Sequence, residues 1–123
     1  MPALGARGEA TLETSAGEMR LLYTNRALMQ AETQMGKSVL GVAEGFTNGV
    51  SGITDVAQLL RVGMEAARRD AREGGRSVTL NDAIAVLEEL GFTTVAATVM
   101  TAVAAVLSYD NSEDQDPDAD PNV

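Results

Sequence analysis

Apolar and polar residues alternate between Glu9 and Thr14, and this period of two is typical of a strand with one buried face. Leu12 lies at the centre of the apolar face, while acidic residues occupy the other face. Ser15-Ala16-Gly17 supplies residue types that favour a turn, and the apolar residues between Met19 and Thr24 predict a return strand. The two segments therefore predict an antiparallel β-hairpin, which is marginal in water unless helices cover its apolar face.

After Thr24 the apolar residues recur at a spacing of three and four, which is the spacing of one helical face. Glycines and turn residues separate the helical segments at Gly36, Thr47-Asn48-Gly49, Gly74-Gly75 and Gly91. Ser, Thr and Asn side chains accept hydrogen bonds from the free N–H groups at the start of a helix. The expected N-terminal caps are Thr24 or Asn25, Ser38, Ser51 or Thr54, Thr79 in a capping box with Asp82, and Thr93 or Thr94.

Each helix is expected to bury one apolar stripe against the hairpin or against another helix. Aromatic residues are only 3% of the chain, so the core must be built from Leu, Val, Ala and Met. We predict an α+β fold over residues 1–109, mostly helical, with an N-terminal two-stranded antiparallel β-hairpin packed on four to five short helices. The expected stripes are Ala27, Leu28, Ala31 and Met35; Val39, Leu40, Val42, Ala43 and Phe46; Val56, Leu59, Leu60, Gly63, Met64 and Ala67; Leu80, Ala83, Ile84, Leu87 and Leu90; and Val95, Val99, Met100, Val103 and Leu107.

Residues 110–123 differ from the rest of the chain, because Asp, Asn, Ser, Gln and Pro replace the large apolar residues before Val123. The chain has a net charge of −9, and six of its eighteen acids lie in this segment, which contains no base. Such a composition cannot bury enough apolar surface to offset the entropy of ordering, so we predict a disordered acidic C-terminal tail. The alternate spacing of the acids resembles a calcium loop, but the central Gly and the final Glu of an EF-hand are absent.

The chain contains no Cys and no His, and Lys37 is its only lysine. Thiolate nucleophiles, disulfides, thiolate zinc sites and the commonest general base near neutral pH are therefore excluded. Gly36-Lys37-Ser38 ends like a phosphate-binding loop, but Ala31 stands where that motif requires its first Gly. We expect no enzymatic activity, no metal and no cofactor, although nothing in the sequence excludes a pair of catalytic carboxylates.

The segment from Gly91 to Tyr109 carries no charge and approaches the length of a membrane span. Its threonines, its many alanines and the lack of a basic flank favour a buried core helix instead. Residues 1–109 contain twelve acids and nine bases, so they offer nothing that attracts a phosphate backbone. We therefore expect neither a membrane span nor nucleic-acid binding.

Two further patterns have both a structural and a functional interpretation. The arginines between residues 61 and 76 are interleaved with acids, which favours a solvated helix face held by pairs such as Glu65 with Arg68 and Arg69. Docking of the acidic tail on this face is the alternative. The methionines either fill gaps in a core poor in aromatic residues or offer an adaptable surface to a helical partner. The arginines of the predicted solvated helix face are Arg61, Arg68, Arg72 and Arg76.

Three motifs together resemble the tail assembly chaperones, or tail tube-associated proteins, of siphophages and gene transfer agents. They are R-G-E-x-x-L before the hairpin turn, T-x-x-A-L-x-x-x-E in the first helix, and G-V-S-G-I-T-D-V-A-Q-L-L-R-V-G-M leading into the third. The resemblance covers residues 7–109 and consists of apolar and capping positions. The matching residues are Arg7, Gly8, Glu9, Leu12, Thr24, Ala27, Leu28, Glu32, Gly49, Val50, Ser51, Asp55, Val56, Leu59, Leu60, Gly63 and Met64.

The resemblance implies a small non-enzymatic protein that acts in tail morphogenesis. Proteins of the chaperone type are implied to coat the long tape measure protein until tail tube subunits polymerise around it. The implied partners are the tape measure protein, the tail tube protein or both, and a homo-oligomer is also open. The implied location is the cytoplasm of a bacterial host cell. The alternatives are a structural tail tube-associated component retained in the virion tail, and an enzyme or regulator unrelated to tails.

The family supplies no binding-site residue that can be transferred to this chain. The arginine-rich segment from Ala66 to Ser77 and the acidic tail both depart from the family's pattern. If an apolar surface binds the partner, the apolar pattern of the first two helices offers the residues for it. The residues that we single out are the exposed parts of Leu28, Met29, Met35, Leu40 and Phe46.

Overall fold

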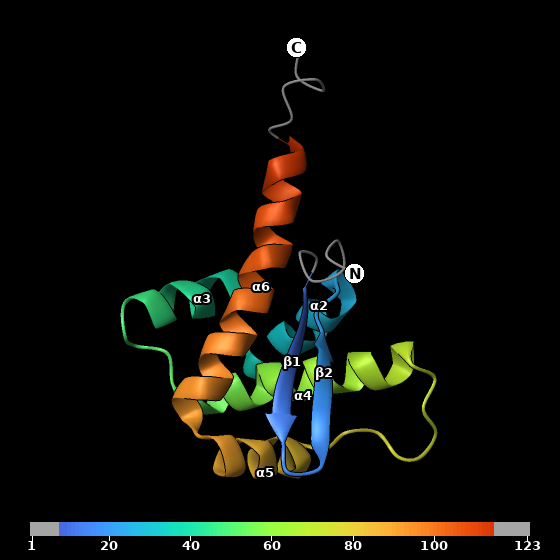
Figure 1. Ribbon diagram of the computed structural model, residues 1–123. Helices are drawn as coiled ribbons and strands as arrows, with labels where there is room; N and C mark the ends of the chain where they lie inside the picture. The colour runs from blue at the N-terminus through green and yellow to red at the C-terminus, as the bar shows by residue number, and fades with distance from the viewer. Residues whose placement is uncertain (1–7, 115–123) are drawn as a thin grey trace.

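The structure, a computed structural model, describes the backbone of residues 8–114 and the side chains of residues 8–108. In Figure 1 the hairpin lies across α4, α5 runs below the hairpin turn, and α6 rises beside β1. This arrangement confirms the predicted α+β fold with an N-terminal antiparallel hairpin packed on helices. In chain order the elements are β1 (Glu9–Thr14), β2 (Gly17–Leu22), α2 (Asn25–Met35), α3 (Val39–Thr47), α4 (Ile53–Asp70), α5 (Leu80–Leu90) and α6 (Phe92–Asp114).

The hairpin is closed by a tight turn in which Thr14 pairs with Gly17. Gly17 has a φ of 114°, a conformation that glycine adopts without strain, and the backbone N–H of Ala16 donates to Thr14 Oγ1. The second strand therefore begins two residues before Met19, where the sequence pattern had placed its start. It ends at Leu22 rather than at Thr24.

Tyr23, which directly follows β2, joins the hairpin to the central helix α4. Its ring is buried, and its Oη donates a 2.8 Å hydrogen bond to the backbone oxygen of Leu59. A Cβ atom at Gly63 would overlap the Tyr23 ring, so only glycine allows this close approach. Burial also raises the pKa of Tyr23 above its ordinary value, so its hydroxyl remains a donor.

The expected apolar stripes largely form the core, with α4 at its centre. Val56, Leu59 and Leu60 are buried on α4, and the predicted valines of α6 have no exposed surface. Leu40 and Ile84 depart from their predicted stripes, because their side chains are 56% and 36% exposed. On α5, Ala83 and Leu87 face the core instead. The rest of the fully buried set includes Leu21, Tyr23, Val42, Val62, Val95, Val99 and Val103.

Most of the expected caps are present. Thr24 accepts from the N–H of Ala27, Ser38 accepts from Gly41, and Thr79 with Asp82 forms the capping box. The predicted cap of the third helix is wrong, because α4 begins after Gly52 with no side-chain cap and neither Ser51 nor Thr54 serves. The last helix begins at Phe92, directly after Gly91, rather than at Thr93 or Thr94.

Two predicted boundaries differ from the structure. α4 ends at Asp70, before Gly74-Gly75, because Ala71 closes its last turn and Arg72 adopts a φ of 58°. Arg72 and Arg76 therefore lie in the following loop and do not extend an arginine stripe on the helix. The backbone of α6 remains helical through Asp114, whereas we had placed the end of the domain at residue 109. Residues 115–123 of the predicted tail lie outside the described part of the chain.

Within residues 8–114 no single helix is both long and apolar enough to cross a membrane. Only the bent pair formed by Leu80–Leu90 and Phe92–Ser108 reaches that length and composition, with an angle of 118° at the break.

Candidate partner-binding surface

The five residues singled out for partner binding fall into three groups. Met29 on α2 and Leu40 on α3 are 67% and 56% exposed, as a contact surface requires. Met35 and Phe46 are partly buried and pack against the core. Leu28 is buried in the core, because it lies on the face of α2 that packs against α4. Leu28 is therefore unavailable to a partner in this conformation.

Two exposed apolar residues that the sequence analysis did not single out flank the start of α4. Val50 is 78% exposed and Ile53 is 58% exposed. Val50 lies between glycines in Gly49-Val50-Ser51-Gly52, and Ile53 precedes the inner stripe of α4. The sequence therefore contained a signal for the exposure of Val50, because an apolar residue in a glycine-rich turn belongs to no buried face of a helix or strand.

The turn that presents Val50 is held firmly against α3. The backbone N–H of Val50 donates to the oxygen of Gly45 at 2.7 Å, and Ser51 Oγ donates to the oxygen of Val42 at 2.7 Å. A Cβ at Gly45 would overlap Ser51 Oγ, so glycine is required for this contact. Because the inner groups of the turn are satisfied by α3, the Val50 side chain projects outward.

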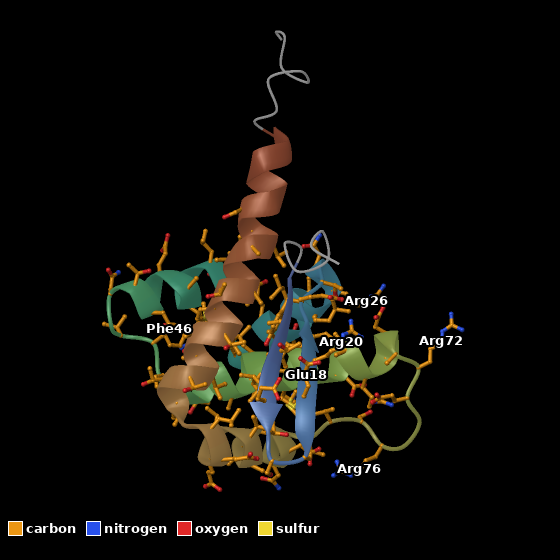
Figure 2. The ribbon with its side chains drawn as sticks, viewed as in Figure 1. Glu18, Arg20, Arg26, Phe46, Arg72 and Arg76 are labelled. Atoms are coloured by element: carbon orange, nitrogen blue, oxygen red, sulfur yellow. The ribbon has the colours of Figure 1, made fainter. Side chains whose placement is uncertain are left out.

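Phe46 and Phe92 join the end of α3 to the start of α6. Their ring centroids are 6.2 Å apart with an interplanar angle of 26°, which is an offset-stacked arrangement. Figure 2 shows Phe46 reaching from α3 toward the lower part of α6. We call Phe46, Val50, Ile53 and Phe92 the apolar edge, since they line the connection around the N-terminal end of α4.

The opposite end of α4 is polar and centres on Glu65. This carboxylate is only 7% exposed and accepts from Arg68, from Arg69 Nε at 2.9 Å and from the backbone N–H of Val78 at 2.9 Å. The Arg68 guanidinium, together with the Val78 and Arg69 donors, lowers the pKa of Glu65 to about 2. The pairs with Arg68 and Arg69 were predicted, but they are organised around a buried acid and not along a solvated face.

Further ion pairs fix the loop and hairpin around this end. Arg76 makes a bidentate contact with Asp82, which lowers the pKa of Asp82 below its ordinary value. Arg20 on β2 donates through Nη2 to Glu9 at 2.7 Å and to Asp70 at 3.2 Å. Figure 2 shows Arg20, Arg26, Arg72 and Arg76 on this side of the molecule, with Arg72 directed away from it.

A groove of about 550 Å³ separates the hairpin from the C-terminal half of α4. Met19 and Arg20 line its hairpin side, and Met64, Ala67 and Ala71 line its helix side. Among residues 8–108 no group of three or more acids could hold a metal ion, and the charged contacts are pairs of an acid with a base. The described residues therefore present this groove and the apolar edge as candidate contact surfaces.

Comparisons of the chain with protein-family models, with curated proteins and with solved structures found no match.

Proposed function

We propose that the chain is a non-enzymatic, phage-like tail assembly chaperone that binds the tape measure protein, the tail tube protein or both during tail morphogenesis. The motif resemblance supplies the biological setting. The observation that carries the proposal is the exposure of more than half of the side chains of Met29, Leu40, Val50 and Ile53 on a domain with an otherwise closed core. Apolar side chains exposed to this extent are suited to cover an apolar segment of another protein.

The physical task of such a chaperone is to shield a long helical chain without binding any one segment tightly. Apolar side chains on short helices and turns can contact the exposed face of a partner helix. Methionine adapts to different neighbours because its side chain is unbranched and polarizable. Many weak contacts along one partner give strong overall retention by multivalency, yet each copy can dissociate when tube subunits arrive.

The first test is co-expression of this chain with a tape measure protein from its source genome. We expect the partner to remain in the supernatant and to co-purify with the wild-type chain. The double variant Val50→Asp, Ile53→Asp should lose co-purification while keeping its fold, because both side chains are exposed. The matched control is Asn81→Asp, Ala85→Asp, which adds the same charge at exposed positions on α5 and should retain binding.

Loss of binding in both double variants would indicate a general charge effect and would contradict the assignment of the apolar edge. Failure of the wild-type chain to bind either the tape measure or the tail tube protein would overturn the proposal.

The composition of finished particles distinguishes the chaperone from the structural alternative. A chaperone should be absent from purified tails, whereas a retained component should be present at a fixed copy number. Quantitative mass spectrometry of purified particles measures this directly. Detection at a constant ratio to the tube protein would favour the structural role.

A further inference from the structure

The hairpin has two free edges, and its register shows which backbone groups point outward on each. The N–H of Tyr23 donates to the oxygen of Gly8 at 2.9 Å, so these two residues form a hydrogen-bonded pair. In an antiparallel ladder such pairs alternate with non-bonded pairs. The pairs Leu12 with Met19 and Thr14 with Gly17 are therefore bonded inward. The N–H and C=O groups of Glu18, Arg20 and Leu22 point away from β1, and no partner for them occurs among residues 8–114.

The outer edge of β1 is unsuited to pairing with itself. Its outward groups belong to Glu9, Thr11 and Glu13, so every antiparallel register brings an acid opposite an acid or a threonine. The helix α6 also lies beside this strand (Figure 1). Acidic residues on an edge strand are a common protection against unwanted pairing.

The outer edge of β2 has the opposite character, because its sequence Glu18-Met19-Arg20 is complementary to itself. When two β2 strands run antiparallel about a two-fold axis with Met19 opposite Met19, Glu18 lies opposite Arg20 of the second copy. The two adjacent registers that use the same backbone groups place Glu18 opposite Glu18 or Arg20 opposite Arg20, which like-charge repulsion disfavours.

The surroundings of β2 leave room for an added strand. The groove of about 550 Å³ runs beside Glu18 and Arg20, and Met64, Ala67 and Ala71 give it an apolar floor. The Arg20 side chain is 38% exposed. Within the described residues it donates only through Nη2, so Nη1 and Nε remain available to another carboxylate.

We propose that β2 pairs edge to edge with β2 of a second copy of this chain, in the register that sets Glu18 against Arg20 and Met19 against Met19. The two hairpins then form one four-stranded antiparallel sheet. Two symmetric charge pairs flank the axis, and the backbone groups of Glu18 and Arg20 gain the partners that they lack in the monomer. This inference goes beyond the tail assembly proposal and does not depend on it.

A charge-exchange experiment tests both the surface and the register. Glu18→Arg gives a homodimer with four arginines around the axis, and Arg20→Glu gives one with four acids. By sedimentation equilibrium over a range of protein concentrations, each variant alone should dimerise about tenfold or more weakly than the wild-type chain. An equimolar mixture of the two variants should dimerise, because each arginine then faces an acid of the other copy.

The control is Glu88→Arg on α5, which makes the same charge change at an exposed site outside the β2 strand and should leave dimerisation unchanged. Arg20→Glu also removes the ion pairs with Glu9 and Asp70, so its circular dichroism and thermal melting are recorded alongside. A monomeric wild-type chain at every concentration, or a mixture that does not recover dimerisation, would overturn the proposal.

Disulfide trapping provides a second measurement that leaves the charges intact. The chain has no cysteine, so Met19→Cys introduces a single thiol. In the proposed register the two Met19 positions form a non-hydrogen-bonded pair with Cα atoms about 4.5 Å apart, within reach of a disulfide. Mild oxidation should give a covalent dimer with Met19→Cys and not with Glu13→Cys on β1. Equal cross-linking of both variants would contradict this register.

Discussion

The two ends of α4 are closed in different ways. At the C-terminal end the buried carboxylate of Glu65 binds two arginines and the backbone of the following loop. At the N-terminal end Val50 and Ile53 of the apolar edge are largely uncovered, and Phe46 at the end of α3 stacks on Phe92. One end therefore has its strongest groups satisfied within the chain, whereas the other presents surface that the chain itself does not cover.

The difference separates stability from recognition within one helix. A buried charge must find partners inside the fold, because leaving it unpaired costs several kcal/mol. An exposed apolar side chain needs no partner within the fold, so it can serve as a contact for another protein with little effect on the free energy of unfolding. Substitutions at the polar end should therefore act on stability, and those at the apolar edge should act mainly on binding.

The largest effect is expected from Glu65→Ala. The change leaves Arg68 and the N–H of Val78 without their carboxylate, so the free energy of unfolding should fall by about 3 kcal/mol. Chemical denaturation measures this value. Glu73→Ala, which removes an exposed carboxylate of the same loop, should change it by less than about 0.5 kcal/mol. Equal effects of the two substitutions would contradict a special role for the buried acid.

The dependence of stability on pH should report the same carboxylate. The pKa of Glu65 is lowered from 4.5 to about 2 in the folded chain, so its ionised form stabilises the fold above about pH 4.5. This contribution should be lost as pH falls from about 5 to about 2, because the unfolded chain takes up the proton first. The difference in unfolding free energy between wild type and Glu65→Gln should therefore narrow over this range. A difference in unfolding free energy that stays constant with pH would show that the negative charge of Glu65 does not stabilise the fold.

Phe46→Ala should have an intermediate effect on stability, because Phe46 both packs against the core and belongs to the apolar edge. The ring is partly buried against Phe92, so its loss should destabilise the fold by about 1–2 kcal/mol, less than removal of a fully buried Phe. Thermal melting checks this value. Phe46→Leu, which retains apolar volume, should recover most of the stability. A loss of unfolding free energy as large as that expected for Glu65→Ala would show that Phe46 is a fully buried core residue.

The smallest effect on stability is expected from Ile53→Ser. Its side chain is largely exposed, so the free energy of unfolding should change by less than about 0.5 kcal/mol. In the co-purification assay the same variant should weaken partner binding at least several-fold. Reduced stability together with unchanged binding would contradict the assignment of binding, and not stability, to the N-terminal end of α4.

Periodicity was informative wherever one face of an element is buried. The alternation around Leu12 and the helical spacing around Val95 and Val99 predicted elements that the structure contains. The caps at Thr24, Ser38 and Thr79 were equally readable, because they depend on residues three positions away. Ile84 and Leu40 show the limit, since the side of a helix that becomes buried depends on neighbours distant in the sequence.

The proposed surfaces depended more strongly on the fold. Met29 and Leu40 were singled out for a contact surface and are exposed, but Leu28, which was singled out with them, is buried. The glycines around Val50 already marked it as exposed in the sequence, but only the fold shows that its turn is held against α3. The hydrogen bond from the N–H of Val78 to Glu65 could not be predicted from local sequence, because the two residues lie on opposite sides of a loop.

The sequence by itself determined the order and type of the elements, most helix starts, the hairpin and the absence of thiol and imidazole chemistry. Those properties follow from short-range hydrogen bonding, apolar periodicity and residue chemistry. The tertiary structure alone decided which acids are buried, which apolar residues remain exposed and which edge of the hairpin is open. Each of these depends on packing between segments far apart in the chain, and only that packing determines which polar groups and apolar surfaces find a partner within the molecule.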